Sequence, residues 1–273
     1  MTLRHTARAE AMLTPELAAA IRSMAGTARE RVFSLSVAGR RYWVKRPGLP
    51  RLRSSVLMQR GLAMLFGLAV LKPPRTGRLA DEAAALRHLH QGGWPVPDVV
   101  FADAQYLVLG DGGISVESLL NAEHDATRRH GMIAACATLL LRLHAAGEWH
   151  GGAQIRNFSW RDGTPGLLDL EDHDLPGMNL AQRQARDCLL LLYSLTRYDR
   201  NPAAPLLAPI ALLLVQGASP AVQAELSRLH RRLGAPIRLA RPWAHKAGRD
   251  VRQALAAEAA LGAALAQVQT GNQ

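Results

Sequence analysis

Residues 141–172 read LRLHAAGEWHGGAQIRNFSWRDGTPGLLDLED and contain three polar side chains at a distinctive spacing. His150 and Asn157 lie seven positions apart, and Asp169 follows the start of the apolar stretch GLLDL. Residues 148–166 form a short polar stretch that leads into this apolar segment. We expect a short apolar strand that presents Asp169 at its end.

Two further charged residues precede this stretch. Lys45 ends the alternating run RRYWVK, and Glu82 begins the helix-like run DEAAALRHL. RRYWVK and the similar run VFSLSV flank Ala38-Gly39, which predicts a β-hairpin. Lys45 is one of only three lysines among 33 basic residues, and a compact ammonium differs chemically from the guanidinium used elsewhere.

The predicted elements divide the chain into residues 1–110 and residues 111–273. The first part combines a helix after Thr14-Pro15, the hairpin, a second helix and two short strands, followed by a glycine-rich connector. The second part is helical, with apolar residues spaced by three and four over 125–147 and again over 186–197. This order predicts an α+β fold with a small β-rich lobe and a helical lobe.

The order lysine, helix glutamate, His-x6-Asn and strand-end aspartate suits phosphoryl transfer. That reaction needs a cation on the nucleotide phosphates, an anion that positions the cation, and oxygen ligands for Mg²⁺. The protein-kinase signature has the same elements in the same order.

Four stretches carry a closer resemblance, and together they span roughly residues 30–197: YWVKRPG, DEAAALRHLHQGGWPVPDVV, the stretch 141–172 and RDCLLLLYSL. In them the chain resembles the atypical bacterial branch of the protein-kinase-like superfamily, especially lipopolysaccharide-core (Kdo-type) kinases and related small kinase-like proteins. The phrase L-x-x-L-x-x-x-G-x-P-V-P, from Leu86 to Pro97, is typical of that branch. The resemblance implies a bilobal kinase-like fold that binds ATP and Mg²⁺.

The resemblance also implies roles for individual residues. Lys45 would contact the nucleotide phosphates and pair with Glu82, while Asn157 and Asp169 would hold Mg²⁺. Asp169, Asn157 and His150 are then the candidate catalytic residues, and Asp187 would brace the catalytic loop from below. Each residue also has an ordinary structural explanation: a surface lysine at a strand end, an acid favoured by the helix dipole, an acid that starts a loop, or a packed histidine.

The chain departs from the kinase signature in the catalytic loop. The signature has an aspartate two residues after the histidine, which accepts the proton of the substrate hydroxyl, and this chain has Gly152 there. Gln154 has no useful proton affinity, so Asp172 and Glu171 are the nearby candidates for a relocated base. No G-x-G-x-x-G precedes the hairpin, so backbone amides of residues 26–29 are the candidates for a phosphate cradle.

The charge of the chain is uneven. Its formal net charge is +11, and residues 31–80 contain eleven Lys and Arg and no acid. This favours an anionic partner, either a membrane surface or lipopolysaccharide, although an arginine-rich codon usage would give the same composition. The apolar run over 61–71 is either an interfacial helix on anionic lipid or a helix packed on the small lobe.

We expect a cytoplasmic protein, peripheral at the inner face of the membrane if the lipid interpretation holds, because no secretory signal is evident. The two cysteines, Cys136 and Cys188, are expected to be core thiols. The leading functional hypothesis is an ATP- and Mg²⁺-dependent phosphotransferase with an anionic sugar-containing or envelope-associated acceptor. The alternative is a pseudokinase, a nucleotide-binding or regulatory module without turnover. An RNA-associated accessory kinase has no support beyond charge.

Overall fold

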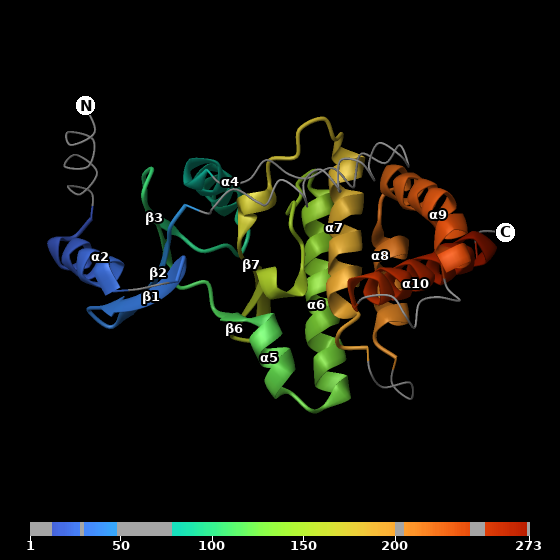
Figure 1. Ribbon diagram of the computed structural model, residues 1–273, viewed down its shortest axis with the longest axis horizontal. Coiled ribbons are helices and arrows are strands. Elements are labelled where there is room, and N and C mark those ends of the chain that lie inside the picture. Colours follow the sequence, from blue (N-terminus) through green and yellow to red (C-terminus); the bar gives the residue numbers. More distant parts are fainter. Residues whose placement is uncertain (1–12, 28–29, 48–77, 200–204, 241–248, 272–273) are drawn as a thin grey trace.

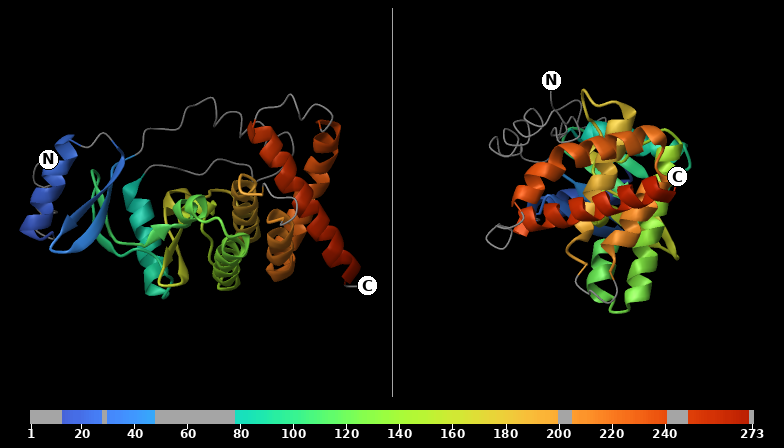
Figure 2. Two further views of the ribbon diagram at one scale, coloured as in Figure 1. Left: turned by 90° about the horizontal axis from the view of Figure 1, so that it is seen from below. Right: turned by 90° about the vertical axis from the view of Figure 1, so that its right-hand side faces the viewer.

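The computed structural model describes residues 13–27, 30–47, 78–199, 205–240 and 249–271. Figure 1 shows small antiparallel sheets towards one end of the molecule and a helical part at the other. The architecture is therefore mixed α+β, as the sequence predicted. Figure 2 shows, from another side, that the chain runs from the sheet end to the helical end along the long axis.

The larger sheet has four antiparallel strands in the order β1-β2-β4-β3. The strands are β1 Val32–Val37, β2 Arg40–Lys45, β3 Val99–Ala102 and β4 Leu107–Gly110. β1 and β2 form the predicted hairpin, and its turn residues Ala38 and Gly39 have positive φ values of 49° and 74°. Two successive positive φ values are typical of the tight turn that joins twisted strands. β4 pairs with the other edge of β2 and places Lys45 opposite Leu107.

One helix, α2 (Pro15–Thr27), packs against β1 of this sheet. The Thr14 hydroxyl accepts a hydrogen bond from the backbone N–H of Leu17 at 3.3 Å, so the helix begins at the predicted cap. Apolar side chains of the helix and sheet form a small separate core: Leu17, Ile21, Phe33, Leu35, Val44, Phe101 and Val108.

The helix that carries Glu82, α4 (Leu79–Gln91), belongs to the main core of the molecule. It ends at Gly92, close to the predicted stop. Its side chains Leu79, Ala83, Leu86 and Leu89 are buried in a core otherwise built mainly from residues beyond 110. α4 therefore packs against the second half of the chain, although it precedes the glycine-rich connector in sequence.

The polar stretch over 148–166 contains a hairpin that the sequence analysis missed. β6 (Phe158–Arg161) and β7 (Thr164–Leu167) pair antiparallel, and β5 (Ile114–Ser115) completes a three-stranded sheet. The turn residues Asp162 and Gly163 have φ values of 49° and 79°. Each strand has only four residues, which is too short an alternation to be recognised in the sequence.

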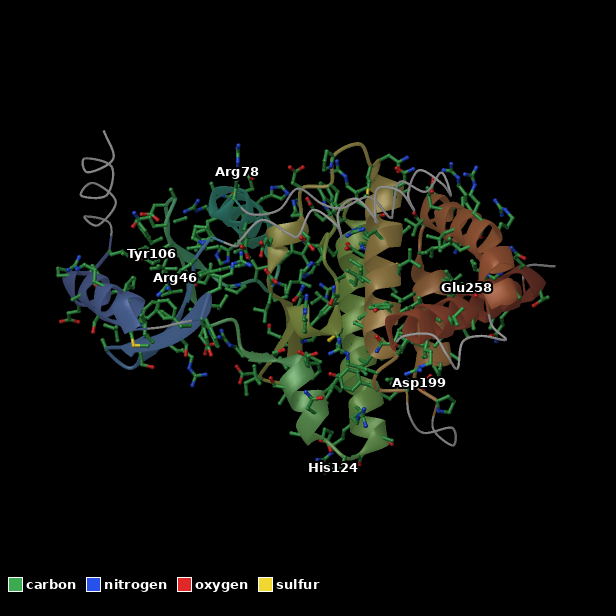
Figure 3. The ribbon with its side chains drawn as sticks, viewed as in Figure 1. Arg46, Arg78, Tyr106, His124, Asp199 and Glu258 are labelled. Carbon is green, nitrogen blue, oxygen red and sulfur yellow. The ribbon has the colours of Figure 1, made fainter. Side chains whose placement is uncertain are left out.

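The rest of the described chain is helical, as expected. The helices are α5 Val116–Ala122, α6 Ala126–Ala145, α7 Leu180–Leu195, α8 Leu207–Gly217, α9 Pro220–Ala240 and α10 Arg249–Gly271. Cys136 on α6 and Cys188 on α7 are free and fully buried, which confirms them as core thiols. His230 of α9 and Glu258 of α10 lie 2.7 Å apart, at the end of the molecule opposite to Tyr106 (Figure 3).

Most of the basic segment between Lys45 and Glu82 lies outside the described residues. The expectations for the apolar run over 61–71, as an interfacial or as a packed helix, therefore concern a part of the chain about which the structure says nothing. Among the helices of the described ranges, none has the length and apolar character needed to cross a bilayer.

Candidate functional site

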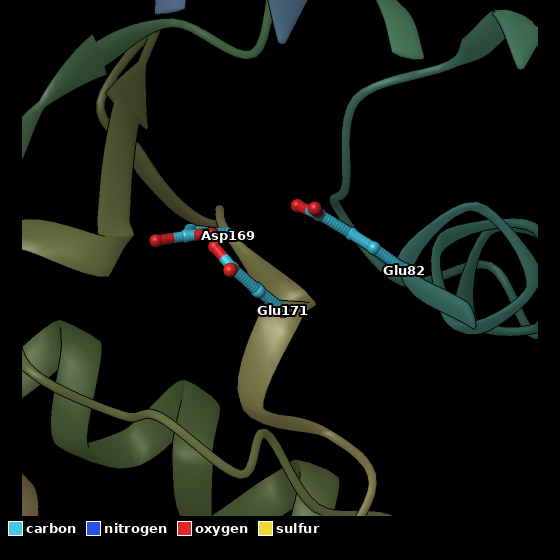
Figure 4. A group of neighbouring side chains, drawn as sticks. All are labelled: Glu82, Asp169 and Glu171. Carbon is cyan, nitrogen blue, oxygen red and sulfur yellow. The ribbon is translucent and has the colours of Figure 1, made fainter. Parts of the chain in front are cut away.

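Lys45 lies at the centre of the site. It is the last residue of β2, and only 6% of it is exposed. Its Nζ lies 2.7 Å from Oε2 of Glu82, 2.5 Å from Oδ1 of Asp169 and 3.3 Å from Oε2 of Glu171. In Figure 4, Glu82 extends from α4 towards Asp169 and Glu171, which share one turn of the chain. The predicted pairing of Lys45 with Glu82 is thereby confirmed, and the strand-end aspartate joins the pair.

The charges in this group determine the protonation of its members. Burial by itself would lower the pKa of Lys45, but the carboxylates of Asp169 and Glu82 outweigh it and raise that pKa. Burial raises the pKa of Glu82 to about 7, against the opposing attraction of Lys45. A close ion pair should lower the pKa of its acid, so the two shifts disagree. We conclude that Lys45 keeps its charge and that Glu82 is the acid that takes up a proton near neutral pH.

The three carboxylates outnumber the cations that face them. Oxygen atoms of Glu82, Asp169 and Glu171 lie within 4.8 Å of one another, and the Lys45 ammonium is in contact with all three. Arg31, just before β1, adds a second cation through Nη2, 2.9 Å from Oε1 of Glu171. The ammonium explains why these acids converge, so the cluster itself does not indicate a metal.

A strained backbone positions Asp169. Its φ of 57° lies in the left-handed region, which costs a non-glycine residue on the order of 1 kcal/mol or more. The preceding Leu168 N–H donates to the carbonyl of Asn157 at 2.8 Å, and a 3₁₀ turn, Leu170–Asp172, follows directly. Partial burial would raise the pKa of Asp169, but the neighbouring Lys45 ammonium lowers it below the usual value, and the side chain remains 42% exposed. It is therefore an ionised carboxylate with access to the cavity.

Asp187 of α7 holds the loop that carries His150. Its carboxylate is fully buried and accepts hydrogen bonds from the backbone N–H of His150 at 2.7 Å and of Gly151 at 2.8 Å. His144 Nε2 lies 3.2 Å from the same carboxylate. The predicted role of Asp187 as a brace is confirmed. Two charge-assisted bonds to one backbone segment explain why this loop keeps its shape.

His150 is fully buried and packs beside the ring of Phe158, with 5.9 Å between the ring centroids. Its Nδ1 accepts a hydrogen bond from the backbone N–H of Gly152 at 3.3 Å. A side chain with no exposed surface does not contact a substrate in this conformation. The structure therefore favours the packed histidine over the catalytic candidate.

Asn157 has the chemistry expected of a metal ligand. Its Nδ2 donates to the carbonyl of Gly152 at 2.8 Å, which leaves the amide oxygen as the remaining acceptor. Asn157 and Asp169 line the same cavity. An amide oxygen and an ionised carboxylate are both hard oxygen donors, so these two residues fit Mg²⁺.

The cavity beside these residues has a volume of about 440 Å³, within the range of small-ligand sites. Its lining combines apolar residues and glycines with polar and charged residues. The apolar residues and glycines are Val32, Trp43, Pro97, Leu109, Gly110, Gly112, Gly113, Ile114 and Leu168. The polar and charged residues are Arg31, Arg41, Lys45, Glu82, Ser115, Ser118, Arg156, Asn157 and Asp169.

The sequence analysis did not single out Arg31, Arg41 and Arg156 for this cavity. No spacing rule distinguishes them in a chain so rich in arginine, and only their convergence in space does. Of the expected phosphate cradle over 26–29, Gly26 and Thr27 belong to α2, and residues 28–29 lie outside the described chain. Gln154 precedes the 3₁₀ turn Ile155–Asn157 and is only partly buried.

The chain matches no protein-family model, and no curated protein matches its sequence. The site combines a buried ammonium held by acids, two oxygen donors that fit a metal, and a cavity lined by apolar and charged residues.

Proposed function

We propose that the chain has a bilobal protein-kinase-like fold and is an ATP- and Mg²⁺-dependent phosphotransferase. One observation carries the proposal: the Lys45 ammonium lies between Glu82 of α4 and Asp169 after β7, and Asn157 lines the same cavity. Strand, helix and loop come from three distant parts of the sequence. Their convergence at one cavity supports the assignment more strongly than any of the motifs alone.

The basic residues that line the cavity suit the phosphates of a nucleotide. Lys45, positioned by Glu82, would bind the phosphates as a point charge, and the three arginines would add cations where a glycine-rich loop is missing. Asn157 and Asp169 would hold Mg²⁺, which neutralises charge on the transferred phosphoryl group when it is bound. Asp187 keeps the intervening loop in place through its two backbone hydrogen bonds.

The apolar lining residues suit a nucleobase. Val32 is 40% exposed on β1 and Ile114 is 54% exposed at β5, although both are large apolar residues. Both line the cavity together with the partly buried indole of Trp43. Apolar surface left uncovered inside a cavity favours a planar aromatic ligand, and the indole offers a stacking face. Leu109, Gly110, Gly112 and Gly113 line the same cavity.

The acceptor class follows from the family resemblance and from the net charge of +11. We propose an anionic acceptor that contains sugar or belongs to the cell envelope, as for a lipopolysaccharide kinase. A cytoplasmic chain that is peripheral at the inner membrane face would reach such an acceptor.

One observation favours a second candidate, a pseudokinase that binds nucleotide without turnover. Gly152 has no side chain at the position of the usual base. General-base help contributes about 10²–10⁴-fold, whereas positioning and charge neutralisation carry most of phosphoryl transfer. The phosphotransferase is therefore the first candidate, because the charged residues of the site are present.

The test uses the full chain with ATP alone, Mg²⁺ alone and both together. At ATP concentrations of about 100 Kd, a single site raises the melting temperature by about 5–10 °C. Asp169→Asn should lose the Mg²⁺-dependent part of this shift and the turnover of radiolabelled ATP. Asp162→Asn is the matched control, because Asp162 lies in the β6–β7 turn and is not among the cavity residues.

No thermal response to any nucleotide would overturn both candidates. Binding without turnover, in the presence of lipopolysaccharide-core fragments, would select the pseudokinase. Equal turnover by the wild type and Asp169→Asn would contradict the phosphotransferase.

A further inference from the structure

The buried glycine at the position of the missing base lies directly beside an acidic side chain. A Cβ atom added to Gly152 would lie 3.4 Å from Cβ and 3.6 Å from Oδ2 of Asp172. We propose that Asp172 takes the place of the missing carboxylate and is the base that accepts the proton of the acceptor hydroxyl. This inference rests on the proposed phosphotransferase function.

The neighbouring glycine explains how the two segments come so close. Gly151 has a φ of +87°, and a Cβ on it would lie 2.8 Å from Cα of His173 and still closer to the Asp172 carbonyl. No real Cβ tolerates such contacts, and positive φ is accessible to glycine at little cost. The backbone of the loop therefore packs directly on the backbone that carries Asp172. A side chain at position 151 would push the Asp172 carboxylate away from the loop.

The geometry separates Asp172 from Glu171, which the sequence left as equal candidates. The two residues are adjacent in the 3₁₀ turn Leu170–Asp172, where successive side chains diverge by about 120°. Glu171 faces Lys45 at 3.3 Å and Arg31 at 2.9 Å, so it belongs to the ammonium cluster. Asp172 faces Gly152 instead.

Asp172 also lies near the residue proposed to hold the metal. The same added Cβ on Gly152 would be 3.6 Å from Nδ2 of Asn157. Asp172 is only partly buried, unlike the fully buried His150. Because Gly152 has no side chain, none of its atoms occupies the space between its own backbone and the Asp172 carboxylate.

In the reaction, the acceptor hydroxyl oxygen forms a bond to the γ-phosphorus of ATP. The bond between that phosphorus and the β,γ-bridging oxygen breaks, and ADP leaves with the electron pair. The hydroxyl proton passes to the Asp172 carboxylate and is later released to solvent. With water as acceptor, the same step gives ADP and inorganic phosphate, so ATP hydrolysis reports on the base without knowledge of the natural acceptor.

The experiment compares Asp172→Asn with Asp174→Asn, a matched substitution of a partly buried acid two residues further on. Asp172→Asn should lower kcat for ATP hydrolysis at saturating MgATP by 10²–10⁴-fold, the usual range for a general base. The Kd for MgATP, followed by thermal shift, should change less than twofold. Asp174→Asn should leave both quantities unchanged. Asp172→Ser serves as a second variant if the Asp172→Asn protein does not fold.

A rescue variant distinguishes a base from a structural residue. The contacts of an added Cβ at Gly152 are ordinary at 3.4–3.6 Å, and its φ is not positive, so the position accepts a side chain. Gly152→Asp in the Asp172→Asn background should recover at least tenfold of the lost kcat, because it restores one carboxylate to the same space. A purely structural Asp172 would not be replaced in this way.

The outcomes for the inference and for the proposed function differ. Equal kcat for Asp172→Asn and Asp174→Asn, with turnover still lost in Asp169→Asn, would overturn the role of Asp172 as the base. The proposed phosphotransferase function would remain. Loss of MgATP affinity in Asp172→Asn, or no gain in the rescue variant, would also overturn the base. A wild type that binds no nucleotide would overturn both.

Discussion

Replacement of Lys45 by methionine tests the charge balance of the site. The substitution keeps an unbranched side chain but removes the ammonium that contacts Glu82, Asp169 and Glu171. Glu82 is only 2% exposed, and no other cation of the described residues lies at contact distance from it. Removal of one partner of a buried ion pair costs about 3–5 kcal/mol, because the other group must either stay buried as an unpaired charge or take up a proton. We expect Lys45→Met to lose that much unfolding free energy at pH 8.

The pH dependence of this loss has a definite sign. In the wild type, Glu82 gives up its proton near pH 7, whereas in Lys45→Met it should keep the proton through pH 8. In the unfolded chain the pKa is 4.5, so Glu82 is ionised there at both pH values. The folded variant then binds one more proton than the unfolded chain, and its stability falls as the pH rises. The variant should lose about 1.4 kcal/mol from pH 7 to pH 8 and the wild type about 0.4 kcal/mol, so the loss relative to wild type should grow by about 1 kcal/mol.

Urea unfolding at both pH values, followed by fluorescence of the five tryptophans, measures these quantities. Glu82→Gln in the Lys45→Met background should remove the extra loss at pH 8, since no carboxyl remains to be ionised. Glu82→Gln alone is the matched control and should change stability by about 1 kcal/mol or less, because Lys45 keeps Asp169 and Glu171. If the unfolding free energies of Lys45→Met and wild type change by the same amount between pH 7 and pH 8, the reasoning is refuted.

Three further predictions concern other parts of the structure. Arg31→Gln should weaken MgATP binding about tenfold in a thermal-shift titration, as expected for a lost charge-assisted bond, whereas Arg87→Gln on the exposed face of α4 should not. Burial lowers the pKa of His173 to about 4, so the unfolded chain takes up a proton at this residue before the folded chain does. The free energy of unfolding should therefore fall by about 2 kcal/mol between pH values above 6.5 and pH 5. The His173→Phe variant should lack this pH dependence in urea unfolding. Asp187→Asn should lower the free energy of unfolding by about 2–4 kcal/mol in the same assay, since it weakens both hydrogen bonds to the loop backbone. A variant as stable as the wild type would contradict the bracing role of Asp187.

Local signals in the sequence were sufficient where a few neighbouring residues control the backbone. Ala38-Gly39 between two alternating runs predicted the first hairpin, and Thr14-Pro15 predicted the start of α2. Asp162-Gly163 carries a similar turn signal, yet the β6–β7 hairpin was missed because its strands are only four residues each. Short strands give too few alternating positions to be distinguished from a polar loop.

The sequence by itself determined the α+β plan, the order of the charged residues and the absence of a side chain at Gly152, because these depend on local periodicity and on residue identity. Only the tertiary structure decided that Lys45 meets Glu82 and Asp169, that Arg31 reaches Glu171, and that Asp172 faces the glycine. These contacts join segments 20 to 140 positions apart, so they depend on how β2, α4 and the 3₁₀ turn pack around one core. Adjacent acids such as Glu171 and Asp172 look equivalent in sequence and acquire different surroundings only when the turn between them is folded.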